Sequence, residues 1–416
     1  MLLPATLVFR FHKNTRYSIA ALLGAVETDS RLEDVRLVAP PELDLESISN
    51  ALEDGLTVIA YSILSTDTTR VRKEVQLVRK HFGDSVVMIA GGAHASARPV
   101  EVLNFGFDYV IIGEGEKAFC DLLDCLMHGK GTNDIPGAIS GKMNNPPVPK
   151  DLPKVDLDSY PPFALKMNVV GPIEVTRGCP YRCKFCSTPF LSGGRVRHRS
   201  IETVVEWLEK AVTKRGFNRI WFLSPNALCY GGPGRRAAPG KLESLLQTAT
   251  SIDGLEEVYF GSFPSEVRPE FVDSDILDML RKYVANETLQ IGLQSGSDEV
   301  LRICNRQHTV SEGLEAIGTS LDCDFIPHVD MIFGLPGESQ DDVRNSIDIC
   351  HKIVNIGGRI HAHVFMPLPG SAFEHMPPGK LDSDTQAELG ELARKGVLTG
   401  SWYQQEEIAK RLARLN

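Results

Sequence analysis

Three cysteines within eight residues are the part of this chain with the clearest chemical potential. The segment TRGCPYRCKFCS places Cys179, Cys183 and Cys186 in one glycine-containing loop. Thiolates at this spacing can wrap one corner of an iron–sulfur cube, because cluster iron prefers soft sulfur ligands. No fourth cysteine lies nearby in the sequence, so one iron would keep an open coordination position. A zinc site completed by a distant His or Cys, or three buried thiols, are the alternatives.

The cysteine motif resembles that of the radical S-adenosylmethionine (radical SAM) enzymes. In GCPYRCKFC, the aromatic Phe185 stands directly before the last cysteine. The resemblance implies a [4Fe–4S] cluster on Cys179, Cys183 and Cys186, which makes these the metal-binding and catalytic residues. It also implies that S-adenosylmethionine binds the open iron. Its reductive cleavage would leave methionine and a 5′-deoxyadenosyl radical that abstracts hydrogen from a substrate.

Three later segments extend this resemblance. GLQSGSDEVLRICNR, DMIFGLPGES and HVFMPLPGS are similar to the family's fourth-, fifth- and sixth-strand segments. Two positions depart from the family: Gln294 stands where common relatives have Glu, and Ser224 stands where many have an acidic residue. Arg268 is expected to pair with the methionine carboxylate, or else to be a solvated surface arginine. The implied contacts to S-adenosylmethionine come from Phe185, Ser224, Arg268, Gln294, Ser295, Gly334 and Phe365.

The first half of the chain is expected to hold a second cofactor. Short apolar runs alternate with helical patterns there, which predicts a parallel sheet wound on both faces, with strands near 5–11, 35–39, 56–64, 85–90 and 108–112. Ligands of such sheets bind at the carboxyl ends of the strands. GGAHASARPVEVLNFGFDYVIIGEGEKAF is similar to cobalamin-binding domains fused to radical SAM barrels. The implied cobalamin contacts are Ser62, Ser65, Thr66, Gly91, Gly92, Ala93, His94, Gly113, Glu114 and Gly115.

The absence of one sequence motif bears on which ligand the cobalt has on its lower side. The Asp-x-His-x-x-Gly loop that supplies a histidine to cobalt in other cobalamin proteins is absent. His12, in RFHKNTRYS, is expected to be a polar loop residue. We therefore expect cobalt without a protein imidazole, an arrangement that favours methyl release to a carbon radical.

Six candidate strands in the second half alternate with helical patterns, near 172–176, 218–223, 256–260, 288–293, 325–333 and 359–365. Six strand–helix units are too few for a closed eight-stranded barrel, which favours an open one. The expected fold is α/β, with a Rossmann-like doubly wound cobalamin-binding domain and a partial (β/α)6 radical SAM barrel. The expected divisions are that domain at 1–135, a proline-rich linker at 136–165, the barrel at 166–370 and a short helical tail at 371–416.

The amino-acid composition limits the classes of partner that the chain is expected to bind. With 416 residues, 42% of them hydrophobic and 24% charged, the chain is neither disordered nor fibrous nor a small disulfide scaffold. A net charge of −10 disfavours nonspecific nucleic-acid binding. No apolar run approaches the roughly 20 residues of a membrane span, and the start lacks a signal-peptide pattern. We expect a cytoplasmic protein, without membrane or nucleic-acid partners, whose six other cysteines mostly serve packing.

The expected function is methyl transfer from methylcobalamin to an unactivated sp3 carbon. The substrate would lie between the two cofactors, with Tyr181, Tyr230 and Arg235 as candidate contacts. A narrower resemblance is to a methanogen group that methylates a glutamine α-carbon in the α subunit of methyl-coenzyme M reductase. Reduction would require a low-potential electron donor. The alternatives are a cyclase, a small-molecule methylase and a non-catalytic cobalamin or metal sensor. Methylthiolation is disfavoured because the first half has only Cys120 and Cys125.

Overall fold

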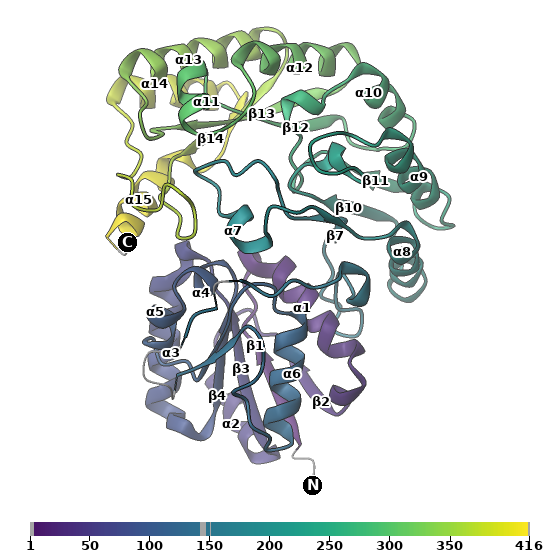
Figure 1. Cartoon of the computed structure of the whole chain (residues 1–416), viewed down its shortest axis with the longest axis vertical. Coiled ribbons are helices and arrows are strands. Elements are labelled where there is room, and N and C mark those ends of the chain that lie inside the picture. Colours follow the sequence, from purple (N-terminus) through teal and green to yellow (C-terminus); the bar gives the residue numbers. More distant parts are fainter. Residues whose placement is uncertain (1–3, 142–146, 150, 415–416) are drawn as a thin grey trace. The chain divides into compact units, whose positions relative to one another are not determined.

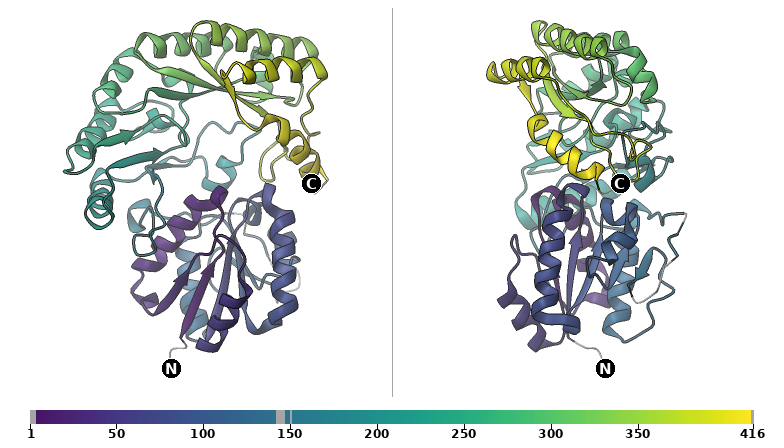
Figure 2. Two further views of the ribbon diagram at one scale, coloured as in Figure 1. Left: turned by 180° about the vertical axis from the view of Figure 1, so that it is seen from behind. Right: turned by 90° about the vertical axis from the view of Figure 1, so that its left-hand side faces the viewer.

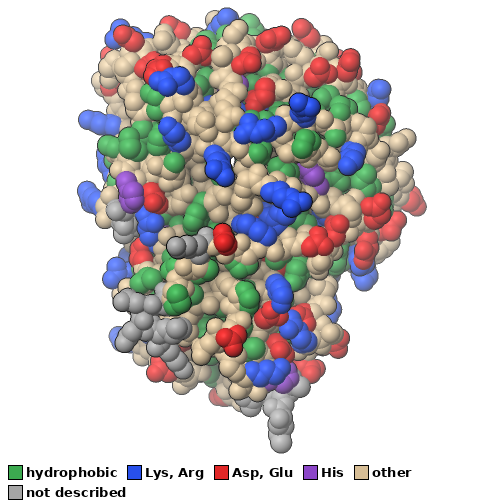
Figure 3. All heavy atoms as spheres, viewed as in Figure 1, with side chains coloured by type: hydrophobic (Ala, Val, Ile, Leu, Met, Phe, Trp, Pro, Cys, Tyr) green, Lys and Arg blue, Asp and Glu red, His purple; other side chains and the backbone are tan. Residues whose placement is uncertain are grey.

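The computed structural model describes residues 4–141, 147–149 and 151–414, and it divides into two compact units, Met1–Gly171 and Pro172–Asn416 (Figure 1). Parts of two expected segments, 142–146 and 150 of the linker and 415–416 of the tail, lie outside the described residues. Within the described ranges, no helix combines the length and the apolar character that crossing a bilayer requires. Acidic and basic side chains are intermingled on the face shown in Figure 3.

Unit 1 is built on a six-stranded sheet with the order β2-β1-β3-β4-β5-β6. The first five strands are parallel and overlap the five predicted ones. The strands are β1 (Ala5–Phe9), β2 (Val35–Val38), β3 (Leu56–Ser62), β4 (Val87–Gly91), β5 (Tyr109–Ile111) and β6 (Ala138–Ser140). The helices are α1 (Arg16–Thr28), α2 (Leu45–Asp54), α3 (Thr68–Phe82), α4 (Ala93–Ala97), α5 (Pro99–Leu103) and α6 (Glu116–Met127).

Helices cover both faces of this sheet. α1 and α6 contribute Leu23 and Leu122 to the core on one face. On the other face, Val71, Val75 and Val78 of α3 are fully buried, as their helical spacing predicts. Each such side chain stabilises the fold by roughly 1.5–3 kcal/mol. The doubly wound arrangement is therefore confirmed, with the loops after β1, β3, β4 and β5 at one edge of the sheet.

The expected linker is largely part of unit 1. Residues of β6 pair antiparallel with β5, so this part of the predicted proline-rich linker belongs to the sheet of unit 1. Further along, the backbone N–H of Val155 donates to Glu114 at 2.8 Å. A Cβ on Gly24 of α1 would lie 2.5 Å from the carbonyl oxygen of Phe163, so the helix packs directly on this segment. Prolines stop helices and central strands, but they do not prevent an extended segment from packing on a domain surface.

Unit 2 contains seven parallel strands in two sheets, β11-β10-β7 and β12-β13-β14-β15. A parallel bridge between Val267 and Ile291 connects the segment after β11 to β12, which completes an open partial barrel. The strands are β7 (Ile173–Glu174), β8 (Thr176–Arg177), β9 (Arg197–His198), β10 (Arg219–Leu223), β11 (Glu257–Tyr259), β12 (Thr288–Gln294), β13 (Ile326–Phe333), β14 (Arg359–Val364) and β15 (Leu398–Thr399).

Most helices of unit 2 line the outer side of these strands (Figure 2). The helices are α7 (Thr188–Ser192), α8 (Ile201–Arg215), α9 (Pro239–Thr250), α10 (Ser274–Arg281), α11 (Asp298–Ile303), α12 (Val310–Asp322), α13 (Gln340–Asn355), α14 (Ser383–Arg394) and α15 (Trp402–Ala413). Of these, α7 directly follows the cysteines and α15 packs against β14. Under α12 and α13, the strand face is apolar and fully buried, as Val329 and Met331 illustrate. Alternate residues such as Asp330 therefore lie on the opposite, inner face.

The tail beyond residue 370 is more than a loop and a helix. β15 adds a parallel strand to β14 through the pairs Ile360–Leu398 and His361–Thr399. The sequence did not predict this strand, because two residues carry no readable periodicity. α14 precedes it and α15 follows it, so the tail extends the strand–helix alternation of the barrel.

Candidate functional site

The cysteine loop of unit 2 is closed at its base by a short hairpin. β8 pairs antiparallel with β9, which brings the residues before and after the loop together. Gly178, at the start of the loop, has φ +95°, and a Cβ there would collide with the carbonyl oxygen of Arg195. Only glycine fits this position. The glycine before the first cysteine therefore sets the path of the loop.

The structure brings the three predicted thiols together. Cys179 and Cys186 each interact electrostatically with Cys183, and Cys186 also interacts with Cys179. The N–H of Cys186 donates to the carbonyl of Cys183 at 3.1 Å, and the N–H of Thr188 donates to the sulfur of Cys186 at 3.4 Å. Burial raises the pKa of Cys179, and it raises that of Cys186 to about 11. Burial disfavours the thiolate form, but a bound metal cluster replaces the protons and stabilises the thiolates. The three residues therefore fit a cluster site.

Two arginines lie at the sulfur of Cys183. Arg306 donates to it at 3.5 Å and Arg268 at 3.7 Å, and both arginines are buried. Cations and hydrogen bonds at cluster sulfurs stabilise negative charge and tune the reduction potential. The prediction of a solvated surface arginine at 268 is wrong. Arg306 was missed because nothing in CNRQH signals that its side chain turns toward the cysteines.

Arg268 is held on several sides. Its Nε donates to Glu270 at 2.6 Å, and its Nη2 donates to the carbonyl of Arg306. Burial disfavours the charge of Glu270, but hydrogen bonding from His308 and attraction to Arg268 outweigh burial and lower its pKa to about 2. The ionised Glu270 therefore neutralises Arg268. Because its Nε, Nη1 and Nη2 already donate to Glu270, Cys183 and Arg306, the guanidinium has few N–H groups left for the methionine carboxylate. That contact stays a prediction.

Tyr181 lies between two guanidinium groups. The Cζ of Arg268 is 3.6 Å from the ring centroid and that of Arg235 is 4.9 Å from it. Arg235 also donates to Gln307 at 2.7 Å and to the carbonyl of Pro180 at 3.0 Å. Such cation–π contacts fix the ring and the cysteine loop that carries it. Two of the three candidate substrate contacts, Tyr181 and Arg235, are thus brought together.

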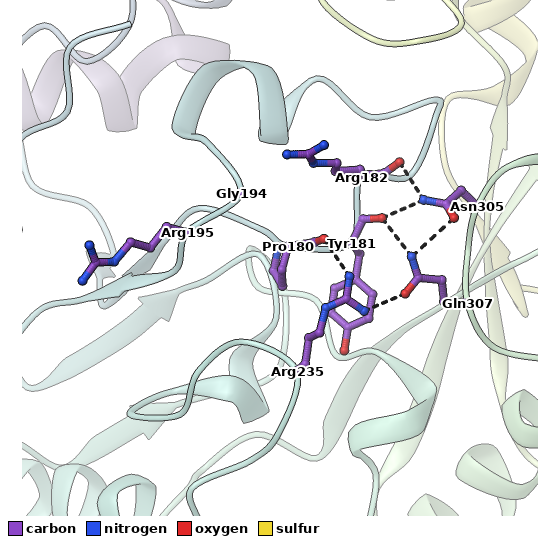
Figure 4. A pocket seen from close by; sticks show the side chains of 8 residues that line it. All are labelled: Pro180, Tyr181, Arg182, Gly194, Arg195, Arg235, Asn305 and Gln307. Carbon is purple, nitrogen blue, oxygen red and sulfur yellow. Dashed lines mark hydrogen bonds between the residues drawn. The ribbon is translucent and has the colours of Figure 1, made fainter. Parts of the chain in front are cut away.

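A pocket of about 500 Å³ lies beside this stack. Arg182 and Arg195 line it, and their side chains extend away from the Tyr181 ring, whereas Arg235 lies along the ring (Figure 4). Asn305 holds the loop from the other side, because its amide donates to the carbonyls of Tyr181 and Arg182 at 2.8 and 3.1 Å. Three arginines give this pocket a positive charge next to the cysteine loop.

Tyr230, the third candidate substrate contact, is buried, and its hydroxyl donates to the carbonyl of Arg199 at 2.8 Å. Its ring packs edge-on against His198 at a centroid distance of 5.3 Å. Tyr230 therefore braces the hairpin that closes the cysteine loop, and its contact with substrate stays a prediction.

The aromatic residue of the cysteine motif meets the end of the sixth barrel strand. Phe185 packs in one apolar cluster with Phe365 and Phe373. The N–H of Phe373 donates to the carbonyl of Lys184 at 3.0 Å, so the segment after β14 is tied to the cysteine loop. Gly334 has φ +74°, and a Cβ added to it would lie 2.7 Å from the Cα of Gly379. The backbone of the two glycines is therefore packed closely.

The remaining candidate contacts to S-adenosylmethionine lie at the ends of β10 and β12. Ser224 is buried, and its hydroxyl donates to the carbonyl of Asn226 at 2.8 Å. Gln294 is buried and has φ +82°, an uncommon conformation for a residue other than glycine. Ser295 is buried, and its hydroxyl accepts the N–H of Ser297 at 3.2 Å. Their roles toward the cofactor stay predictions.

Two further cysteines lie close to the triad. Cys229 interacts with Cys179 and Cys304 with Cys183, and both side chains are buried. Burial raises the pKa of each to about 12, as it also raises that of Cys186 to about 11. The packing roles of Cys229 and Cys304 stay predictions. Cys323 and Cys350 are also buried and fit packing roles.

In unit 1, the loop after β4 is shaped by Gly92. Its φ is +93°, and an added Cβ would lie 2.8 Å from the backbone nitrogen of Ile63 and 2.9 Å from the hydroxyl of Ser62. The N–H of Ile63 donates to the carbonyl of Gly91 at 2.8 Å. The loops after β3 and β4 therefore touch through backbone, and the small residues Gly91, Gly92 and Ala93 leave this strand edge open to a flat ligand.

His94 joins the same two loops. Its Nδ1 lies 3.0 Å from the hydroxyl of Ser65, which stands beside Thr66 in the turn after β3. Its ring is buried, and its Nε2 has no hydrogen-bond partner among the described residues, with Glu101 at 3.6 Å. An unpartnered buried nitrogen at this edge is compatible with a bound ligand. His12 instead lies 3.7 Å from Asp67 as a polar loop residue.

The loop after β5 contacts the segment that follows β6. The carboxylate of Glu114 accepts the N–H of Val155, and an added Cβ on Gly113 would lie 3.1 Å from Leu152. Gly115 is the N-cap of α6, and an added Cβ there would lie 3.2 Å from Leu22. The cobalamin contacts of all three residues stay predictions.

Comparisons with known proteins agree with both sites. Residues 173–350 match the model of the radical SAM superfamily, and residues 4–123 match that of the B12 binding domain. An uncharacterized protein of Methanopyrus kandleri is 22% identical over 92% of this chain and 79% of its own length. A tRNA-2-methylthio-N(6)-dimethylallyladenosine synthase of Magnetococcus marinus is 28% identical over 55% of this chain, which spans about half (52%) of that relative.

Solved structures show the same fold. The methyltransferase TsrM of Kitasatospora setae, with cobalamin and a [4Fe-4S] cluster bound, has a TM-score of 0.70 at 17% identity, over 91% of this chain and 78% of its own. The cobalamin-dependent enzyme OxsB has a TM-score of 0.69 at 14% identity, over 95% of this chain and 56% of its own. The predicted fold class and cofactor set are confirmed: cobalamin for unit 1, and a [4Fe–4S] cluster with S-adenosylmethionine for unit 2.

Proposed function

We propose that this chain, a member of the radical SAM superfamily that also carries a B12-binding domain, transfers a methyl group from cobalamin to an unactivated sp3 carbon. The observation that carries the proposal is the pairing of these two domains with a three-cysteine loop. The three cysteines of the loop lie together, whereas Cys229 and Cys304 are buried thiols outside the motif. When bound, S-adenosylmethionine at the open iron supplies a hydrogen-abstracting radical, and cobalamin supplies the methyl group.

The residues of the chain position and insulate this chemistry. Gly178 and the β8–β9 hairpin set the path of the cysteine loop, and Arg268 and Arg306 stabilise charge at Cys183. The apolar cluster around Phe185 and Phe365 excludes water next to the cysteines. Excluding water protects a carbon radical from side reactions while cofactors carry the difficult step. An external low-potential electron donor is also required.

A glutamine α-carbon in the α subunit of methyl-coenzyme M reductase is the substrate that we favour. Peptide carbonyls accept hydrogen bonds, and the pocket beside Tyr181 offers the guanidinium groups of Arg182, Arg195 and Arg235 as donors. A peptide segment thus fits the chemistry of this pocket. The narrower resemblance of the sequence to a methanogen group supports the choice of glutamine.

The test uses the full chain, purified without oxygen and reconstituted with iron, sulfide and cobalamin. It is reduced and supplied with methyl-deuterated S-adenosylmethionine and peptides. These include the glutamine-containing segment of methyl-coenzyme M reductase and the same segment with Ala for Gln. Mass spectrometry follows 5′-deoxyadenosine and the mass of the peptide.

Each outcome separates the possible functions. Deuterated methyl on the glutamine peptide alone, with 5′-deoxyadenosine formed, supports the proposal. Formation of 5′-deoxyadenosine with a changed but unmethylated substrate indicates a cyclase or another radical reaction. A reconstituted protein that binds cobalamin but never cleaves S-adenosylmethionine is a sensor, and methyl transfer is then wrong.

A further inference from the structure

Strand register brings two histidines and an aspartate together on the inner face of the barrel. His361 and His363 are alternate residues of β14, so their side chains point to the same side. Asp330 of β13 stands directly opposite His361 in the parallel pairing. The helix-covered face of both strands is apolar, as Val329 and Ile360 show. Asp330 and His363 begin the two segments that resemble the family's fifth- and sixth-strand motifs. None of the three residues belongs to the cysteine loop or to the seven implied contacts of S-adenosylmethionine.

The distances among these three side chains suit ligands of one ion. Nδ1 of His361 lies 2.9 Å and Nε2 of His363 lies 3.5 Å from Oδ1 of Asp330. One ligand atom from each residue lies within 4.8 Å of the other two. Ligand atoms about 2.1 Å from a metal stand roughly 3.0–3.4 Å apart. A small movement of the two rings would therefore complete a three-ligand site.

The negative charge of the buried Asp330 carboxylate also favours a bound cation. Asp330 is buried, and among the described residues no Lys or Arg forms an ion pair with it. The hydrogen bonds from Gln290 and His361 both reach its Oδ1. Buried charges are normally paired or coordinate metals. The two histidines are partly exposed, so an ion can reach them from the interior of the barrel.

We propose that Asp330, His361 and His363 bind one divalent transition-metal ion, separate from the iron–sulfur cluster. Two imidazoles and one carboxylate suit Zn²⁺ or Fe²⁺, whereas Mg²⁺ and Ca²⁺ prefer oxygen ligands alone. Three protein ligands leave at least one coordination position open. That position faces the barrel interior, where water or an oxygen or nitrogen atom of a small ligand can occupy it.

Two glutamines form the outer layer of this site. Gln290 donates to Asp330 at 2.7 Å and fixes its carboxylate. The amide of Gln405, on α15, accepts the N–H of Val364 at 2.8 Å and lies 3.2 Å from Nδ1 of His363. Metal binding at Nε2 leaves the proton on Nδ1, so the carbonyl oxygen of Gln405 must turn to accept it. Gln405 is therefore a positioning residue for His363.

The competing interpretation is a hydrogen-bonded network with no metal, in which Asp330 only orients the two imidazoles. Both interpretations require the same residues for stability, so a loss of activity cannot separate them. Metal binding itself can. Zinc is the appropriate probe because the cluster contains iron, and a zinc measurement therefore reports on this site alone once the cysteines are occupied or removed.

The experiment measures zinc in two preparations of the full chain. One is the reconstituted wild-type holoenzyme, and the other has Cys179, Cys183 and Cys186 all replaced by Ala. Each is incubated with Zn²⁺, passed through gel filtration and analysed by elemental mass spectrometry and zinc X-ray absorption. We expect one zinc per chain, with imidazole scattering, in both. Gln405→Ala removes an outer-layer partner and should weaken zinc binding by roughly 10–100-fold. His361→Ala and His363→Ala each remove a ligand and should weaken zinc binding by more than that.

His351→Ala is the matched control, because His351 is an exposed histidine of α13 that pairs with Glu388. It should retain full zinc binding. Absence of stoichiometric zinc from both preparations overturns the proposal, and so does zinc binding by His361→Ala and His363→Ala that equals that of His351→Ala. If the cysteine-free chain does not fold, the holoenzyme with its histidine variants decides alone.

Discussion

Arg268 points its guanidinium at the sulfur of Cys183, with Nη1 3.7 Å from Sγ. The same guanidinium stacks on Tyr181, two residues before Cys183 in the loop. A buried cation thus contacts both a cluster ligand and the backbone segment that carries it. Charge and loop geometry are coupled at this one side chain.

Replacing Arg268 by Met should lower the reduction potential of the cluster. Removing a nearby cation disfavours the additional electron, and a shift of about 60 mV equals a tenfold change in a one-electron equilibrium. Spectroelectrochemical titration of the reconstituted protein measures it. Arg268→Lys keeps the charge and should shift the potential less. Arg302→Met, on the exposed side of α11, should leave it unchanged; a similar shift there would contradict the assignment.

Cys183→Ala should abolish both cluster assembly and cleavage of S-adenosylmethionine, because two ligands cannot hold the cluster. Iron and sulfide analysis, together with 5′-deoxyadenosine formation, measure the loss. Cys229→Ala removes a buried thiol near Cys179 that lies outside the motif, and should retain the cluster. Loss of iron in Cys229→Ala would show that this thiol, too, is a ligand.

Gly92→Ala should destabilise unit 1 and weaken cobalamin retention. An added Cβ approaches the backbone of Ile63, and φ +93° is strained for alanine, so a cost of about 1–3 kcal/mol is expected. Corrin absorption after gel filtration and a denaturant titration measure the two effects. Gly131→Ala is the control, since nothing lies within 4 Å of its added Cβ. Equal behaviour of the two variants would refute the steric argument.

Glu338→Gln should remove a pH dependence of stability. Burial raises the pKa of Glu338 from 4.5 to about 7, so the folded chain holds a proton that the unfolded chain has released between these values. Wild-type stability therefore falls as pH rises from about 4.5 to 7, by roughly 3 kcal/mol at most. Urea titrations at pH 5 and pH 8 should show a smaller fall for Glu338→Gln. Glu315→Gln, on an exposed part of α12, should behave as wild type.

The elements that the sequence predicted best are those with a strong local pattern. The five parallel strands of unit 1 are runs of Val and Ile, and the cysteine triad is readable from its spacing alone. β6 and β15 were missed because three and two residues are too short to show a period. Their pairing depends on tertiary contacts, which no window of sequence contains.

The surroundings of the site were harder to foresee for the same reason. Arg306 reaches Cys183 across more than a hundred residues of chain, through the return of the strand β12 and the turn after α11. The pair His361 and His363 carried a usable signal, because histidines at alternate positions of a candidate strand share a face. Asp330 could join them only once the register of β13 against β14 was known.

The two residues of β15 also determine what kind of strand β14 is. With Leu398 and Thr399 paired to Ile360 and His361, this part of β14 has both edges occupied. Without them, its outer edge would present unpaired N–H and C=O groups, which promote pairing with strands of other molecules. The tail of this barrel therefore also guards against aggregation, and a chain shortened before residue 398 should self-associate before it loses its cysteine loop.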